Sequence, residues 1–151
     1  MAEKIATATA DAVTVRILSP DGSRLLPVCA YHPDPGAAEA IGAIMRQTAE
    51  VDSGLWAEVV GHRQARRWQI DPRTSVADAS ADQTSFIGRY QVRAVLGLPL
   101  VDGGQLVGGL ALFRLGVARP YTDHEQALAE ECALRIGPVV GMQRLIDQLE
   151  P

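Results

Sequence analysis

Arginine side chains gather in the middle of this sequence. Residues 61–93 include six arginines and three acidic residues, whereas residues 121–150 include two arginines and six acids. A guanidinium can donate two parallel hydrogen bonds to a carboxylate or a phosphate, so this excess predicts a site for an anionic small molecule. Solvated surface charge is the alternative explanation, and it is the commoner situation for arginine. The predicted ligand-binding arginines are Arg67, Arg89 and Arg93.

Three aromatic residues lie among these arginines in the sequence: Trp68, Phe86 and Tyr90. Their rings could stack on a planar ligand, which makes them candidate ligand-binding residues beside the arginines. Aromatic side chains in such positions more often pack in a hydrophobic core, so both interpretations stay open.

Other residue types that carry chemistry are sparse. Neutral imidazole is a common iron ligand, and the chain has three histidines, so haem is a minor alternative for the ligand. Cys29 and Cys132 form no CxxC pair and predict two small core residues, not a disulfide or a zinc site. No GxSxG, P-loop or HExxH pattern is present, and we therefore expect no catalytic activity. The sequence assigns no cofactor.

The composition is that of a single domain over residues 1–151. With 47% hydrophobic residues the chain can form a substantial core, and a formal net charge of −4 does not favour nucleic acid as a partner. The longest uncharged apolar stretch, residues 103–113, is far shorter than the roughly 20 residues that span a bilayer. The sequence thus predicts a cytoplasmic protein without a membrane segment.

Short patterned segments predict the elements that would position these residues. Loosely alternating or polar edge-type segments predict strands over residues 12–18, 25–31 and 65–70. Two nearly all-apolar strands, 94–101 and 106–113, flank Asp102-Gly103, which favours a hairpin turn in the middle of a sheet. Helices are predicted over residues 36–50, from 52 or 53 to 61, and 85–91, with a loop over 71–84.

A long helix is predicted over residues 123–150. Thr122 and Glu125 have the spacing of a reciprocal helix cap. Pro138 is expected to kink the helix, because proline lacks the N–H that this turn needs. The expected packing face consists of Leu128, Cys132, Ile136, Val139 and Val140.

An apolar stripe continues beyond that face through Leu145, Ile146 and Leu149. A stripe with nothing of its own domain beneath it predicts a partner helix, and a homodimer through the terminal helices would supply one. Residues 1–10 would form the end of an N-terminal helix in that arrangement. A frayed chain end is one alternative, and a kink that returns the stripe to its own sheet is another.

The order and spacing of these segments resemble a GAF domain. The stretches VRAVLGLPL, QLVGGLALF and YTDHEQALAEECA are similar to the second half of that family's pattern, and DAVTVRILSPDG is similar to its first strand and turn. The resemblance covers nearly the whole chain. It implies an α+β, GAF/PAS-like fold in which a central antiparallel sheet of five to six strands has its terminal helices on one face. Short helices and loops, here residues 52–61 and 71–91, would cover a pocket on the other face.

The family's ligands can be compared with this sequence. Members bind cyclic nucleotides, haem, bilins, amino acids or other small molecules, and many serve as dimerising relays without a known ligand. The chain lacks the Asn used by members that bind cyclic nucleotides, and it lacks a central Cys for a covalent bilin or for sulfoxide reduction. The resemblance implies a sensory domain of a bacterial signal-transduction protein that binds a small molecule and relays the result through its terminal helices. A ligand-free dimerisation module is the alternative.

Overall fold

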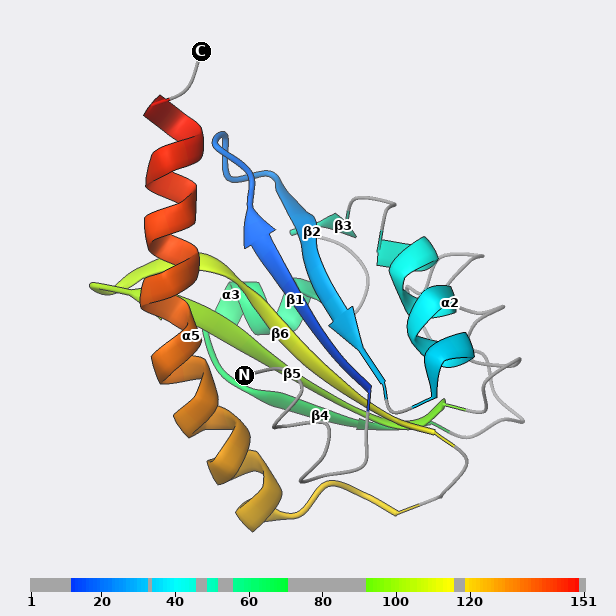
Figure 1. The fold of residues 1–151 in the computed structure, drawn as a ribbon. Coiled ribbons are helices and arrows are strands. Elements are labelled where there is room, and N and C mark those ends of the chain that lie inside the picture. The colour runs from blue at the N-terminus through cyan, green and yellow to red at the C-terminus, as the bar shows by residue number, and fades with distance from the viewer. Residues whose placement is uncertain are drawn as a thin grey trace.

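The structure is a computed structural model, and it describes residues 12–32, 34–45, 49–51, 56–70, 92–115 and 119–149. Its centre is a six-stranded antiparallel sheet with the strand order β3-β2-β1-β6-β5-β4 (Figure 1). The strands are β1 (Ala12–Leu18), β2 (Arg24–Tyr31), β3 (Ala49–Glu50), β4 (Arg66–Gln69), β5 (Val92–Asp102) and β6 (Gln105–Leu115). The helices are α2 (Pro35–Met45), α3 (Trp56–His62) and α5 (Asp123–Leu149). The predicted α+β fold is confirmed.

The hairpin of β5 and β6 lies in the middle of the sheet. Asp102 pairs with Gln105, so Gly103 and Gly104 form the turn, with φ angles of 58° and 81°. Glycine adopts positive φ without steric cost, and a two-residue turn of this kind matches the twist of its strands. Most residues of β5 and β6 are buried, as their apolar sequences predict.

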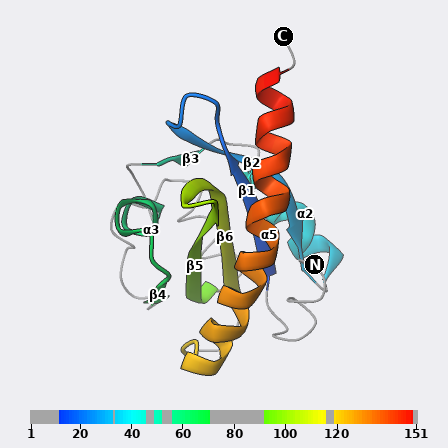
Figure 2. The same ribbon diagram turned by 90° about the vertical axis from the view of Figure 1, so that its left-hand side faces the viewer.

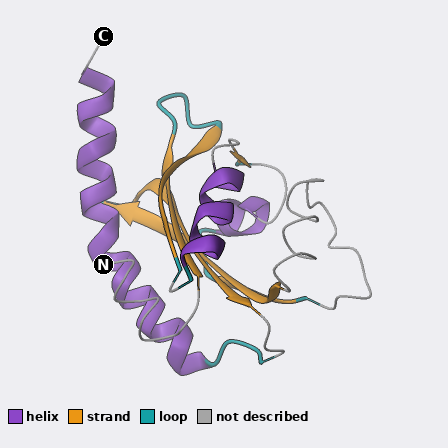
Figure 3. Cartoon of the chain, turned by 45° about the vertical axis from the view of Figure 1, so that its right-hand side comes forward, coloured by secondary structure: helices purple, strands orange, loops and turns teal. Residues whose placement is uncertain are grey.

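The two faces of the sheet carry different helices. Figure 3 shows α5 on one face and α2 and α3 on the other, and in Figure 2 α5 lies in front of the strands. On the first face, residues of β1, β5 and β6 pack against four apolar residues of α5, namely Ala129, Ala133, Ile136 and Val140. On the second face, the sheet packs against Ile41 of α2 and against Trp56 and Val59 of α3. We call this second face the α3 face.

The start of α5 carries the predicted reciprocal cap. The backbone N–H of Glu125 donates to Thr122 Oγ1 at 3.1 Å, and the backbone N–H of Thr122 donates to Glu125 Oε1 at 3.0 Å. Pro138 lies about halfway along the helix, and Figure 3 shows the helix axis changing direction about halfway along. A bend is expected there because proline cannot donate to the carbonyl of Leu134. Both features agree with the sequence prediction.

Two glycines let the backbone of α5 rest on the β5–β6 hairpin. A Cβ atom on Gly137 would collide with the carbonyl of Val101, and one on Gly141 would collide with the carboxylate of Asp102. A larger residue at either position would push the helix away from the sheet, because packed interiors leave no spare volume.

Two predicted element boundaries are wrong. The helix predicted over residues 36–50 ends at Met45, and Ala49–Glu50 instead forms strand β3, paired with β2. Strand pairing overrides the local helical pattern there. The short helix continues past Gly61 to His62 and is followed by Arg63, whose φ is 51°.

Two predictions about burial are also wrong. Val139, predicted on the packing face of α5, is 68% exposed. The buried stripe follows the 3.6-residue period through Ala133, Gly137 and Gly141, which leaves position 139 on the solvent side. Cys29, predicted in the core, is exposed, because the packing of α5 is concentrated on β5 and β6 and β2 lies toward the edge of the sheet.

Several predicted elements lie outside the described residues: the helix end over residues 1–10, the loop 71–84 and the helix 85–91. Within the described ranges, no helix combines the length and the apolar character needed to cross a membrane.

Candidate functional site

Strand β1 places two polar side chains, Thr14 and Arg16, on the α3 face. Side chains along the strand alternate between the two faces of the sheet, and the odd-numbered ones lie on the face that packs against α5. Across the ladder to β6, Thr14 pairs with Ala111 and Arg16 pairs with Gly109. Helix α2 packs on β2 and α3 packs on β5, so β1 lies between the strands that carry these helices.

Arg16 is buried without a charged partner among the described residues. It is 6% exposed, and its Nη1 donates a hydrogen bond of 3.0 Å to the carbonyl oxygen of Leu25. None of the described ion pairs includes it. Burial lowers the pKa of the Arg16 guanidinium, because the charged form loses its hydration. The α3 face thus contains a desolvated positive charge.

Two tryptophans pack on glycines of the same face. Trp56 of α3 is 8% exposed, and a Cβ atom on Gly109 would lie 2.5 Å from its Cζ3 atom. Trp68 of β4 is partly buried, and a Cβ on Gly97 would lie 3.2 Å from its Cζ3 atom. The glycines leave room for the two indoles, which form apolar walls on the α3 face.

The predicted site residues Arg67 and Trp68 lie on opposite faces of the sheet. Arg67 Nη1 donates to the carbonyl of Tyr121 and Nη2 donates to Asp123 Oδ1, both at 2.8 Å, on the α5 side. Strand alternation explains this arrangement, because adjacent residues of a strand point to opposite faces. A ligand role for either residue stays a prediction.

The remaining predicted site residues are placed only in part. Arg93 is partly buried beside an irregularity in the pairing of β5 with β6, and its carbonyl accepts a hydrogen bond from Ile70 at 2.8 Å. Phe86, Arg89 and Tyr90 lie outside the described residues.

Sequence reasoning missed Arg16 and Trp56. A signal for Arg16 was present, since Thr14 and Arg16 alternate with apolar residues in a strand that is buried along its whole length. Polar residues facing inward from a central strand are candidates for ligand contact. Trp56 had no such signal, because an apolar residue at helical spacing looks like ordinary core.

A polar cluster joins the α5 side of the sheet to the start of α5. Arg114 of β6 is buried, pairs with Glu125 and donates to the carbonyls of Arg119 and Pro120 at 2.9 and 3.1 Å. Its guanidinium lies 4.2 Å from the ring centroid of Tyr121. Burial raises the pKa of the Glu125 carboxyl, but hydrogen bonds from Thr122 and the Arg114 charge outweigh this and hold it below its ordinary value.

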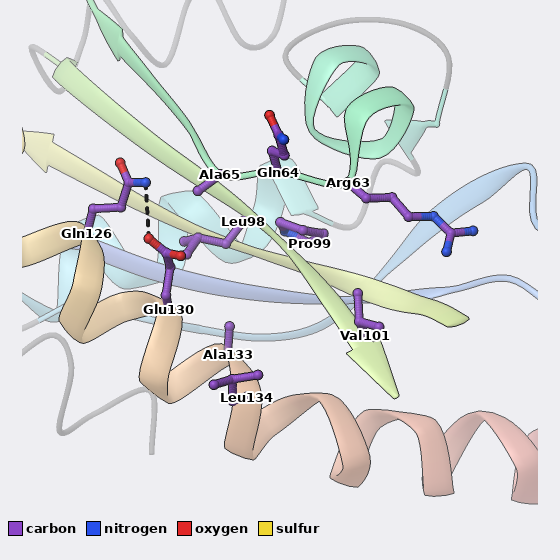
Figure 4. Close-up of a pocket in the computed structure, with 10 residues that line it drawn as sticks. All are labelled: Arg63, Gln64, Ala65, Leu98, Pro99, Val101, Gln126, Glu130, Ala133 and Leu134. Carbon is purple, nitrogen blue, oxygen red and sulfur yellow. Dashed lines mark hydrogen bonds between the residues drawn. The ribbon is translucent and has the colours of Figure 1, made fainter. Parts of the chain in front are cut away.

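A cleft of about 470 Å³ lies between α5, β5 and residues 63–65 (Figure 4). Apolar side chains line its inner part, among them Leu98, Val101 and Ala133. At the rim Gln126 Nε2 donates to Glu130 Oε1 at 3.1 Å. Arg63 points away from the cleft in Figure 4, and its Nη1 donates to the carbonyl of Gly104 at 2.8 Å. Its position beside α5 distinguishes this cleft from the pocket that the sequence predicts on the opposite face.

Metal coordination finds no support in the described ranges, where no group of three or more His, Cys, Asp or Glu side chains is placed to hold an ion.

The fold is shared with known GAF domains. The GAF domain/HD domain protein from Geobacter sulfurreducens is 17% identical, with a TM-score of 0.75 over 97% of this chain and 91% of that chain. The second GAF domain of DevS from Mycobacterium smegmatis is 16% identical, with a TM-score of 0.67 over 99% and 94%. GAF3 from Slr1393 of Synechocystis sp. PCC6803, in its photoproduct state, is 20% identical in sequence. Its TM-score is 0.65, over 99% of this chain and 94% of that chain.

The sequence itself matches the same family. A profile of the GAF domain family matches residues 3–140 of the chain. None of the curated protein sequences is a significant match. Because the profile covers most of the chain and the fold agrees with it, this chain belongs to the GAF domain family.

Proposed function

We propose that this GAF domain is the sensory part of a cytoplasmic signal-transduction protein. It binds a small molecule on the α3 face and passes the resulting change to a second copy of the chain through α5. No catalytic step is part of the proposal.

The observation that carries the proposal is a second apolar surface on α5. One side of the helix packs on the sheet, and the other exposes six large apolar side chains: Leu134, Val139, Met142, Leu145, Ile146 and Leu149. We call these residues the α5 stripe. An apolar surface of this kind on a long helix favours a partner helix, and a second copy of the chain supplies one by two-fold symmetry.

The C-terminal end of α5 extends beyond the strands of the sheet (Figure 1). Arg144 Nε donates to the carbonyl of Leu18 and its Nη2 donates to that of Ser19, both at 3.2 Å, which anchors α5 to the turn between β1 and β2. Leu145 and Leu149 follow this anchor and are exposed. The anchor holds the helix in a fixed direction while its stripe remains available to a partner.

The start of α5 is tied to strands that belong to the ligand-binding sheet. Arg67 of β4 and Arg114 of β6 bind Asp123 and Glu125 in its first turn. Trp68, next to Arg67 in β4, lies on the α3 face. A ligand that shifts β4 or β6 would therefore shift the first turn of α5, which gives the relay a physical route.

One structural neighbour supports a sensory role. GAF3 from Slr1393 is described in a photoproduct state, which is a state that light produces in that protein. The present chain shares its fold at 20% identity, so the likeness supports a domain that changes state and leaves the stimulus open.

Light scattering at micromolar concentration tests the relay. We expect a dimer, and we expect Leu145→Asp to convert it to a monomer, because a carboxylate in an apolar helix–helix contact loses its hydration. Gln148→Asp adds the same charge to an exposed polar position one turn away and should leave the dimer intact. A chain that is monomeric without any substitution would contradict the dimer.

A ligand-free relay is the second candidate function. It is favoured by the packing of Trp56 and Trp68 against Gly109 and Gly97, which fills part of the α3 face with side chains of the protein itself. Native mass spectrometry of freshly purified protein separates the two functions. A retained small molecule supports sensing. If that molecule is haem, the visible absorption spectrum of the purified protein identifies it.

A further inference from the structure

We propose that Arg16 anchors an anion-binding site on the α3 face, and that the ligand of this domain is a small molecule with a carboxylate or phosphate group. The inference rests on the proposed function, because it names the ligand class and the contact for the same binding event.

Arg16 has no counter-charge among the described residues. Arg16 stands on a strand flanked by β2 and β6, and 6% of its surface is exposed. A buried charge is costly unless a partner compensates it. A guanidinium has five N–H donors, and the described residues accept one hydrogen bond from Arg16, at Leu25.

A second buried arginine of the same chain provides an internal comparison. Arg114 is 3% exposed, and it has a carboxylate partner in Glu125 as well as backbone carbonyls. This is the usual structural solution for a buried guanidinium. Arg16 is buried to a similar degree and has no carboxylate partner among the described residues. The ligand would supply the anionic group that Glu125 supplies to Arg114.

Two acidic side chains on described elements near Arg16, Asp21 and Glu58, have other partners. Asp21, in the turn after β1, accepts hydrogen bonds from Ser19 and Ser23. Glu58 of α3 pairs with Arg66 of β4, with 3.4 Å between Oε2 and Nε. Neither carboxylate forms an ion pair with Arg16 in the described ranges.

The neighbours of Arg16 suit a small ligand with a polar head and an apolar body. Thr14 is buried two residues away on the same face, and its Oγ1 lies 3.5 Å from the carbonyl of Ala111, at the outer limit of a hydrogen bond. That hydroxyl can add a contact to an anion beside Arg16. Gly109, paired with Arg16, carries no side chain, and the indole of Trp56 lies over it as an apolar wall. A carboxylate or phosphate matches the guanidinium fork.

The test compares Arg16→Met with Arg114→Met by thermal unfolding. Methionine keeps most of the side-chain volume and removes the charge. If Arg16 is the anchor of an anion site, Arg16→Met removes an uncompensated charge. In anion-free buffer the variant should then melt about 2 °C or more above the unsubstituted protein. Arg114→Met removes the nearer ion-pair partner of the partly buried Glu125, which keeps only a longer contact with the exposed Arg119, and should melt at a lower temperature than the unsubstituted protein.

The same measurement is repeated with succinate, with inorganic phosphate and with uncharged succinamide. We expect the melting temperature of the unsubstituted protein to rise with succinate or phosphate and not with succinamide. The rise should be absent in Arg16→Met and retained in part in Arg16→Lys. Succinate and phosphate separate the two anion classes.

Each other outcome overturns the inference in a recognisable way. Arg16→Met that melts lower or fails to fold assigns Arg16 a structural role. An anion response that survives in Arg16→Met places the anion elsewhere and leaves the sensory function intact, as does a neutral molecule retained in native mass spectrometry. Absence of any retained mass together with absence of any response rejects both the anchor and ligand sensing, and the ligand-free relay then stands.

Discussion

At the residue scale, the α3 face depends on positions that carry no side chain. Gly109 and Gly97 admit the indoles of Trp56 and Trp68, which would otherwise be held off the sheet. Packed interiors respond to a single added methyl group, since the neighbours must move to accommodate it. Aromatic rings are rigid neighbours in this respect, and Trp56 is buried, so it has little room to retreat.

Gly109→Ala should therefore destabilise the domain by about 1–3 kcal/mol, the usual cost of overpacking a core. The added Cβ would lie 2.5 Å from Trp56 Cζ3, which is closer than carbon atoms tolerate. Chemical denaturation measures the change. Gly42→Ala in α2 is the matched control, because nothing lies within 4 Å of the added atom and alanine favours a helix. Equal stability of the two variants would contradict the assigned contact of Trp56.

The sequence contained part of the candidate site and not its geometry. An excess of arginine in residues 61–93 was visible, but a count of charges does not say which face of a strand each one occupies. Arg67 and Trp68 are adjacent in β4, and strand alternation alone separates them. Arg16 stood outside the arginine-rich segment. Its importance comes from burial and from the lack of a carboxylate among the described residues, and a linear sequence shows neither.

At the element scale, the first turn of α5 is fixed both by its own cap and by the sheet. Thr122 and Glu125 exchange hydrogen bonds, and Arg114 holds Glu125 from the sheet. The cap is local and was readable from spacing, whereas the ion pair joins β6 to α5 and needed the fold. Strands β1, β5 and β6 were predicted for the same reason as the cap, because their patterns are local. Strand β3 was missed because it exists through pairing with β2.

Thr122→Ala should lower the free energy of unfolding by about 1 kcal/mol, since the backbone N–H of Glu125 loses its side-chain acceptor. Thr122→Ser keeps a hydroxyl at the same place and should have a much smaller effect. Urea denaturation distinguishes the two variants, and an unchanged midpoint for Thr122→Ala would argue against the cap.

The carboxyl of Glu125 should also make α5 sensitive to acid. Its pKa is lower in the folded protein than its ordinary value, so the unfolded chain binds the proton more readily. The stabilisation is therefore complete above the ordinary pKa of glutamate and is lost as the pH falls through the lowered value. Asp21, whose pKa is lowered to about 2 by hydrogen bonds from Ser19 and Ser23, acts in the same direction.

The contribution of Glu125 is isolated by comparison with Glu125→Gln. The unsubstituted protein should be more stable than this variant at pH 7, and the difference should shrink at about pH 3, below the usual range of glutamate. Unfolding curves at the two pH values measure it. A difference that stays constant between them would show that Glu125 does not titrate with folding.

At the scale of the whole molecule, the two faces of the sheet carry different charged groups. The α3 face holds the buried Arg16, and the opposite face holds α5 with its ion pairs to β4 and β6. Strands β1, β6 and β5 are shared by both faces, because their side chains alternate between them. Under the proposed relay, a change on one face would reach the other through a single layer of backbone, without a long chain of intermediates.

The placement of the two tryptophans confines tryptophan fluorescence to one face of the sheet. The chain contains two tryptophans, and both indoles lie on the α3 face, Trp56 over Gly109 and Trp68 over Gly97. Indole emission depends on the polarity and motion of its immediate surroundings, so intrinsic fluorescence of this protein reports on one side of the sheet. The proposed association through α5 would take place on the opposite side of the sheet, away from both indoles. Emission and particle mass are consequently two separate signals, one for events on the α3 face and one for assembly, and neither requires an attached label.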